Sequence, residues 1–243
     1  MLKGIYDTMS GKFVSERRLE MISNNLANAL TPGFKASRPV VNVVEDNTSP
    51  TSPDSLGPTY ISVIDSYIHF SAAPLVETKN NLDVAIEGDG FFVVSTKDGN
   101  MYTRNGKFTL DQDKRLVTLD GSPVLGQNGE ITIDARQGGD VKIENDGSIF
   151  VDRVVVDRLK VVDFADKKPL INYGESKFVN TNPANQETTP ESFTVRQGFY
   201  EASNVNIMNE MVDLMSTVRA YETYSKVDQF FGDALEKLVN IGR

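Results

Sequence analysis

The end of the chain carries an apolar repeat that predicts one long α-helix. From residue 206 onward, large apolar residues recur at spacings of three and four, which is typical of a helix that packs along a single line. The stripe shifts by one residue after Tyr221 and then continues, so one helix of about nine turns accounts for it. Asn206 is a suitable N-cap, because its side chain can accept a hydrogen bond from the first turn.

The start of the chain carries a weaker repeat of the same kind. We assign residues 1–36 to an N-terminal helical segment, because Thr31-Pro32-Gly33 cannot continue a helix. Charge favours pairing of the two ends, since residues 1–38 hold six basic and three acidic side chains and residues 199–243 hold four and seven. The spacing therefore predicts two helices that pack against each other in a coiled-coil-like arrangement.

Between these ends the sequence is typical of an antiparallel β-domain. Short β-branched and aromatic runs alternate with dipeptides that accept the positive φ of tight turns. These dipeptides are Asp98-Gly99, Asn105-Gly106, Asp120-Gly121, Asn128-Gly129 and Asp146-Gly147. We expect the β-domain at residues 76–179, with linkers or extended connections at 37–75 and 180–205, where Ser, Thr, Asn and Pro concentrate. The predicted fold class is α+β.

Composition excludes several classes of protein. The net charge of −9 argues against nucleic-acid binding, which needs a basic surface. No run reaches the roughly 20 apolar residues of a membrane span. Charged residues within the first twenty positions argue against a cleaved signal peptide. The absence of cysteine excludes disulfides and thiolate metal sites.

Candidate chemical sites are weak. His69 is the only histidine, and it stands in an alternating run typical of a strand. Gly88-Asp89-Gly90 lacks the rest of a phosphate-loop fingerprint. Asp111 and Asp113 suggest a calcium loop, but Arg115 occupies the position of a third ligand. We therefore predict no catalytic, cofactor-binding or metal-ligating residue and no cofactor, and we expect no enzyme.

Two other classes remain open from the residues alone. A β-rich hydrolase that uses two carboxylates is possible, because 34 acidic residues always allow such a pair. A ligand-binding β-domain displayed on a coiled coil is the other. Against both stands the breadth of apolar surface on the end helices, where Phe13, Tyr224 and Phe230 spread around the helix rather than along one line. We expect these helices to become stable only beside neighbouring chains.

Three stretches resemble the rod and hook proteins of the bacterial flagellum. They are GIYDTMSGKFVSERRLEMISNNLANALTPGFK, NNLDVAIEGDGFFVVSTKDGNMYTRNGKFTLDQDKRLVTLDGSPVLG and VRQGFYEASNVNIMNEMVDLMSTVRAYETYSKV, in that order along the chain. The chain is most similar to the proximal-rod type, with the distal-rod type as the alternative. It differs at Ala29-Leu30, where the family more often has Val-Asn.

The resemblance implies a structural subunit without catalysis. In that family both termini form an axial α-helical domain, and the subunits assemble helically into the drive shaft that transmits motor torque across the periplasm. The implied partners are copies of itself, other proximal and distal rod subunits, the flagellar type III export apparatus and the surrounding ring bushing. Export without a cleaved signal peptide agrees with the first twenty residues.

We predict the subunit interface on the two end helices. Its apolar members follow the helical stripes, and its three amides precede Pro32, where we expect them to bond neighbouring subunits or to cap the last carbonyls. The predicted interface residues are Ile5, Met9, Phe13, Leu19, Ile22, Asn24, Asn25, Leu26, Asn28, Ile207, Met211, Leu214, Val218, Tyr221, Phe231, Leu235 and Leu238.

Overall fold

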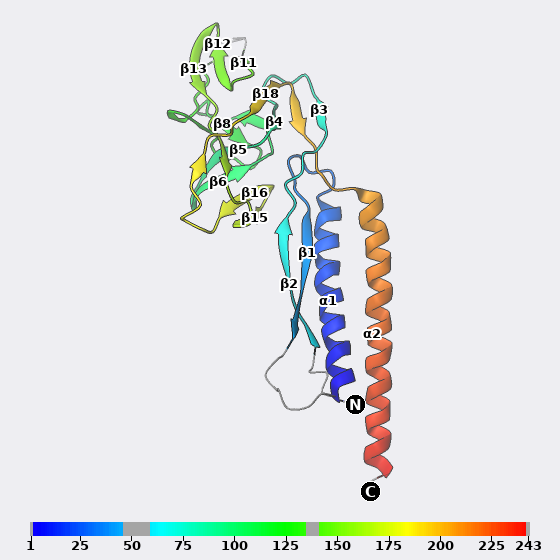
Figure 1. Ribbon diagram of the computed structural model, residues 1–243. Helices are drawn as coiled ribbons and strands as arrows, with labels where there is room; N and C mark the ends of the chain where they lie inside the picture. Colours follow the sequence, from blue (N-terminus) through cyan, green and yellow to red (C-terminus); the bar gives the residue numbers. More distant parts are fainter. Residues whose placement is uncertain (1, 46–58, 135–140, 242–243) are drawn as a thin grey trace. The chain divides into compact units, whose positions relative to one another are not determined.

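The computed structural model describes residues 2–45, 59–134 and 141–241 (Figure 1). It divides into two compact units. Unit 1 comprises Met1–Ala27, Ser37–Tyr67 and Asn206–Arg243, and unit 2 comprises Asn28–Ala36 and Ile68–Val205. The Ser- and Pro-rich part of the connection predicted at 37–75, residues 46–58, lies outside the described residues.

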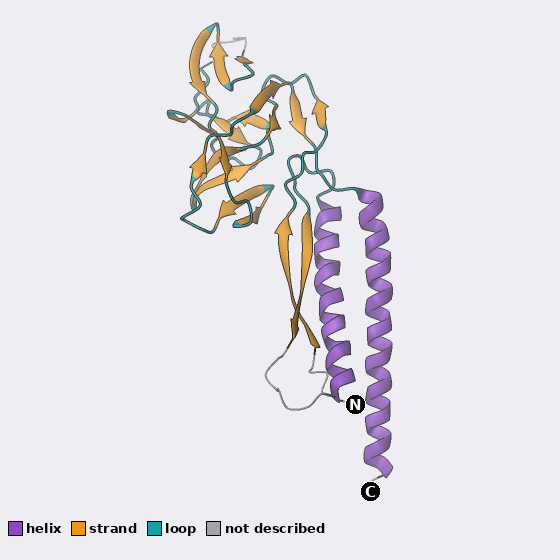
Figure 2. Ribbon diagram, viewed as in Figure 1, coloured by secondary structure: helices purple, strands orange, loops and turns teal. Residues whose placement is uncertain are grey.

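Unit 1 is built from two long helices and a two-stranded antiparallel sheet (Figure 2). Its elements are α1 (Leu2–Ala27), β1 (Ser37–Glu45), β2 (Thr59–Ile68) and α2 (Ile207–Ile241). The two helices lie side by side and run in opposite directions (Figure 1). The segment 37–75, which we expected to be a linker or an extended connection, contains two long strands. Its Val- and Ile-rich runs favour strands, and a linker assignment overlooked them.

Local chemistry explains where the helices begin and end. Asn206 caps α2 as predicted, because its Oδ1 accepts a hydrogen bond from the Asn209 amide at 3.1 Å. α1 ends at Ala27, nine residues short of the predicted segment boundary. A turn follows, in which the Thr31 amide donates to the Asn28 carbonyl at 3.1 Å, and Gly33 takes a φ of 67°.

Unit 2 is a β-rich body in which all the described strand pairs are antiparallel. Its largest sheet has six strands in the order β15-β16-β6-β5-β14-β17. The strands are β3 (Leu75–Glu77), β4 (Val84–Gly88), β5 (Phe91–Thr96), β6 (Gly99–Thr103), β7 (Phe108–Leu110), β8 (Leu116–Thr118), β9 (Leu125–Gly126), β10 (Gly129–Glu130), β11 (Val141–Ile143), β12 (Ser148–Val151), β13 (Val154–Arg158), β14 (Val161–Phe164), β15 (Leu170–Gly174), β16 (Lys177–Asn180), β17 (Glu187–Thr188), β18 (Phe193–Gln197) and β19 (Phe199–Glu201).

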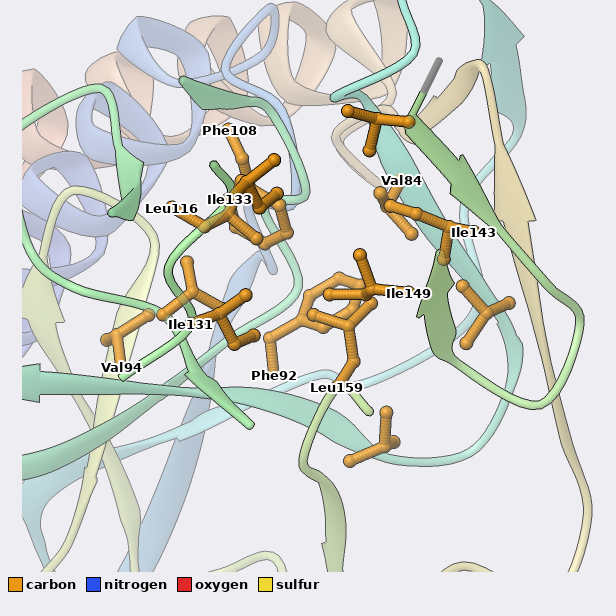
Figure 3. Packing of buried hydrophobic residues seen from close by; sticks show 14 of the residues in the cluster. Val84, Phe92, Val94, Phe108, Leu116, Ile131, Ile133, Ile143, Ile149 and Leu159 are labelled. Carbon is orange, nitrogen blue, oxygen red and sulfur yellow. The ribbon is translucent and has the colours of Figure 1, made fainter. Parts of the chain in front are cut away.

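Strand β5 separates two hydrophobic cores. Phe92 and Val94 point into the larger core, which also contains residues of β4, β8, β11 and β12 (Figure 3). Phe91 and Val93 point to the opposite side, where Phe178 packs against them. Side chains alternate between the faces of a strand, so four consecutive buried residues identify a strand that is covered on both faces.

The turn dipeptides act in two ways. Glycines of four of them, including Gly99 and Gly147, have positive φ, as the turns require. Asn105-Gly106 is different, because Gly106 has no positive φ and instead lies against β4. A Cβ atom at this position would stand 1.6 Å from the Val84 carbonyl oxygen. This glycine therefore serves a close backbone approach rather than a hairpin.

Residues 68–75 and 180–205, on either side of the expected β-domain, also belong to unit 2, whereas residues 37–67 belong to unit 1. Residues 180–205, which we expected to be a connection, contain β17, β18 and β19. β18 pairs with β4, and β19 pairs with β3, so the alternating Phe193 and Val195 complete the body rather than lead away from it. The α+β class, with a β-rich centre and a helix at each end, is confirmed. Neither described helix has the length and apolar character of a membrane span.

Candidate assembly surface

The contact between α1 and α2 is built around small residues. Gly11 lies directly against Tyr224, so that a Cβ atom on the glycine would stand 2.5 Å from the tyrosine ring. One turn further along α1, Ser15 is buried and its hydroxyl donates to the Gly11 carbonyl at 2.8 Å. Thr217 of α2 is buried as well. These residues let the two helices approach each other closely, and the aromatic ring fills the space above the glycine.

A buried polar node joins the end of α1 to the start of β1. The Asn25 side chain is 1% exposed; its Oδ1 accepts from the Ser37 amide and its Nδ2 donates to the Ser37 carbonyl, both at 2.9 Å. Nδ2 also donates to Oε2 of Glu210 at 3.3 Å. Glu210 is fully buried, and its Oε1 lies 2.8 Å from the Arg38 guanidinium. The node thereby ties α1, α2 and β1 together.

The three predicted interface amides therefore have different surroundings. Asn25 bonds the Ser37 backbone and the Glu210 carboxylate within its own chain, and its place at a subunit interface stays a prediction. Its amide geometry suits the node because one side chain both donates and accepts. Asn24 is exposed, and the Asn28 Oδ1 accepts from the Thr31 hydroxyl at 3.2 Å.

Large apolar side chains remain exposed on both helices of unit 1. On α2 they follow one face at spacings of three and four, and we refer to these residues as the α2 stripe. The α2 stripe consists of Met208, Met211, Val212, Met215 and Val218. Met208 is 70% exposed and Met215 is 54% exposed. On α1, Met9 and Phe13 are more than half exposed. Apolar surface of this extent on one helix face is typical of an interaction site.

The predicted interface residues divide into three groups. Some are exposed in the lone chain, namely Met9, Phe13, Asn24, Ile207, Met211 and Val218. Others are buried or half-buried, namely Leu19, Ile22, Asn25, Leu26, Asn28, Leu214, Tyr221 and Phe231. The side chains of Ile5, Leu235 and Leu238 lie outside the described residues. The apolar members of the first group are exposed on the surface of the lone chain, and the second group packs at least in part within the chain itself.

Sequence reasoning missed part of the exposed face. Met208, Val212 and Met215 lie one position from the predicted stripe, and they are more exposed than Met211. Only the single best-spaced line of apolar residues was assigned to the interface. The signal was present, because three of the seven methionines of the chain stand between residues 208 and 215. The ion pair between buried Glu210 and half-buried Arg38 was missed too, since no local pattern marks an ion pair between distant segments.

Unit 2 contains charged clusters with structural partners. Arg115 pairs with Asp111 at 2.8 Å and lies 3.5 Å from Asp113, so an arginine of the same loop occupies the space beside the carboxylates considered for calcium. The His69 Nδ1 lies 3.1 Å from the Ser71 hydroxyl. Within the part of the chain that the structure describes, no group of three or more acidic or histidine side chains is placed to hold a metal ion.

A groove of about 710 Å³ on unit 2 contains an ion pair between Lys177 and Asp120. Burial alone would raise the pKa of the Asp120 carboxyl, but hydrogen bonds from Lys177 and Ser122 outweigh that effect and lower this pKa to about 2. The Lys177 ammonium also lies 3.3 Å from Glu175. The groove is therefore lined by paired charges.

Comparison with known proteins identifies the family. The chain matches three family models: Flagella basal body rod protein over residues 15–35, Flagellar hook protein FlgE/F/G D1 domain over 85–151 and Flagellar basal body rod FlgEFG protein C-terminal over 196–241. It is 34% identical to the flagellar basal-body rod protein FlgF of Caulobacter vibrioides, and the match covers 93% of this chain and 92% of that protein. The chain belongs to the flagellar basal-body rod protein family.

Other rod proteins are similar along nearly the whole chain. FlgF of Rhizobium meliloti is 31% identical over 98% of this chain and 97% of its own length. FlgG of Buchnera aphidicola subsp. Acyrthosiphon pisum is 34% identical over 98% of this chain and 99% of its own length. The rod protein described here is thus a structural subunit of the flagellar basal body that assembles with other rod proteins. The alternative, a carboxylate-dependent hydrolase, receives no support.

Proposed function

We propose that this rod protein packs side by side with neighbouring rod subunits through the α2 stripe and the exposed end of α1. The observation that carries this proposal is the row of large apolar side chains left exposed by the lone chain. Covering such surface releases roughly 25 cal/mol for each Å² of apolar area removed from water. In this proposal α1 and α2 form the axial, coiled-coil-like part of a helical shaft that transmits torque across the periplasm.

The chemistry of the α2 stripe suits several different neighbours. Methionine is unbranched and flexible, so one methionine-rich face can adapt to partners of unlike shape. A rod that contains more than one kind of subunit presents unlike neighbours. We therefore propose that the α2 stripe contacts other copies of this chain as well as related rod proteins.

We assign this chain to the FlgF, proximal-rod type. The aligned length supports this assignment, because the match to the Rhizobium meliloti FlgF runs over 242 positions, close to the 243 residues of this chain. The match to the Buchnera FlgG covers the same share of this chain but runs over 262 positions, so that FlgG carries insertions. A distal-rod, FlgG-type subunit is the alternative.

Export by the flagellar type III apparatus and contact with the ring bushing around the shaft complete the proposal. Membership of the rod protein family supports both. In this proposal, the exposed apolar side chains of the helices are buried only when neighbouring subunits pack against them. The subunit therefore becomes fully stable only on docking. No catalytic step belongs to this function.

The test places charge on the α2 stripe. The double variant Met211→Lys, Met215→Lys should keep its helical circular dichroism, because both side chains are exposed in the lone chain. It should be reduced at least tenfold in isolated basal bodies, since docking would bury two ammonium groups. The control variant carries Thr223→Lys and Gln229→Lys, which change exposed polar residues of the same helix.

Recovery of the double variant from the periplasmic fraction distinguishes failed docking from failed export. Normal incorporation of the Met211→Lys, Met215→Lys protein into basal bodies would exclude the α2 stripe as a subunit interface.

A further inference from the structure

The exposed methionines of the described chain all lie on the surface that we assign to docking. The structure describes the side chains of six methionines, and four of them are between 44% and 70% exposed. These four are Met9, Met208, Met211 and Met215. The other two are buried: Met21 is 9% exposed within unit 1, and Met101 is 2% exposed within unit 2. Among the described residues, exposed thioether sulfur is therefore confined to the α2 stripe and the exposed end of α1.

The three methionines of α2 form one continuous patch. The spacings from Met208 to Met211 and from Met211 to Met215 are three and four residues, so their side chains are neighbours on one helix face. They make up three of the five members of the α2 stripe, and the other two, Val212 and Val218, are pure hydrocarbon. A chemical change at sulfur therefore alters most of this surface at once.

Methionine is the member of the α2 stripe whose polarity a mild oxidant can change. Hydrogen peroxide transfers one oxygen atom to the thioether: a sulfur lone pair forms the S–O bond, the O–O bond breaks, and the second oxygen leaves as water. The sulfur is oxidised to the sulfoxide and the peroxide is reduced. Because peroxide must reach the sulfur, exposed methionines react before buried ones, and Met101 provides a protected reference in the same chain.

A sulfoxide on the α2 stripe opposes docking. The thioether is apolar, whereas the S–O group is a strong dipole that accepts hydrogen bonds from water. Packing against an apolar neighbour would remove that water and leave the oxygen without a donor. Three adjacent sulfoxides would add these penalties on the face that must be covered.

We propose that Met208, Met211 and Met215 form an oxidation-sensitive site, at which peroxide converts the free subunit into a form that does not dock. The loss of docking rests on the proposed function, whereas the selective oxidation is a property of the lone chain. A docked subunit has its stripe covered by a neighbour. Oxidation therefore excludes incoming subunits and spares those that are already assembled.

The first test measures oxidation in the dilute chain. The protein is treated with hydrogen peroxide, and the sulfoxide at each methionine is quantified by peptide mass spectrometry over time. Met208 and Met215 should be oxidised at least tenfold faster than Met101, because their sulfurs are open to solvent. In isolated basal bodies the same two methionines should react about as slowly as Met101. Equal rates at Met208 and Met101 in the dilute chain would overturn the proposal.

The second test compares two triple variants at the same positions. Changing Met208, Met211 and Met215 all to Gln places a polar amide of similar length where the sulfoxide would stand. This variant should keep its helical circular dichroism and be reduced at least tenfold in basal bodies. Changing the same three residues to Leu keeps an apolar surface without sulfur. The Leu variant should be incorporated as well as wild type, and peroxide treatment of the cells should lower the incorporation of wild type only.

The outcomes separate this proposal from the docking surface itself. Normal incorporation of the Gln variant, or a Leu variant as sensitive to peroxide as wild type, would overturn the oxidation-sensitive site. If the Gln variant is incorporated normally while Met211→Lys, Met215→Lys is not, only the oxidation-sensitive site fails and the α2 stripe stands as an interface. If both are incorporated normally, the docking surface fails as well.

Discussion

At the scale of single residues, two amide side chains hold separate segments of the chain together. Asn25 joins a helix end to a strand, and Asn204 joins the ends of three segments. Each side chain both donates and accepts, and each bonds backbone groups of other segments. Such roles are invisible in a sequence, because an amide with a distant partner looks the same as an exposed amide.

The Lys177–Asp120 pair gives a prediction on pH. Because the pKa of Asp120 is lowered to about 2 in the folded chain, the pair contributes stability above about pH 4, and this contribution is lost as the pH falls towards 2. Asp120→Asn should lower the free energy of unfolding at pH 7 by about 1 kcal/mol after solvent screening. The difference in free energy of unfolding between wild type and Asp120→Asn should shrink as the pH falls from 4 to 2, because the carboxylate becomes protonated. Urea denaturation at each pH measures this difference.

Glu144→Gln is the matched control for that prediction. It removes an exposed partner of Lys142 at 3.3 Å and should change stability by a few tenths of a kcal/mol at most. A constant difference between wild type and Asp120→Asn from pH 7 to pH 2 would mean that the carboxylate charge contributes nothing.

At the scale of elements, the close approach of α1 and α2 depends on Gly11 and Tyr224. Gly11→Ala has two opposing effects, since alanine favours a helix by about 1 kcal/mol and its Cβ atom meets the tyrosine ring. We expect Gly11→Ala to destabilise the wild-type chain and to stabilise the Tyr224→Ala chain, so that the two changes couple by more than 1 kcal/mol in a double-mutant cycle. Thermal unfolding followed by helical circular dichroism measures this coupling. Additive effects would contradict the contact.

Elements differed in how far the sequence predicted them. The repeat after Asn206 predicted α2 and its cap, because helical periodicity is a local signal. The strands at 37–45, 59–68 and 187–201 were assigned to connections. These strands form by pairing with strands that are distant in the sequence, such as β4 for β18 and β3 for β19. Within residues 180–205, the composition led us to predict one continuous connection, but strands β17, β18 and β19 lie inside it.

At the scale of the whole molecule, the surface available for assembly could be predicted only in part. The sequence indicated apolar helices in need of neighbours, and the family resemblance indicated a shaft. Which apolar residues stay exposed depends on which side of each helix its intramolecular partner covers. That is why Ile22 and Tyr221, expected at the interface, are covered at least in part by their own chain, while Met208 and Met215 are exposed.

Hydrogen exchange of the α2 amides, compared between dilute monomer and assembled rod, tests the central claim most directly. The account predicts that amides between Met208 and Val218 exchange readily in the monomer and at least a hundredfold more slowly in the rod, whereas β5 amides are protected equally in both. Equal protection of the α2 stripe in monomer and rod would contradict the claim that neighbouring subunits supply the missing cover of this helix.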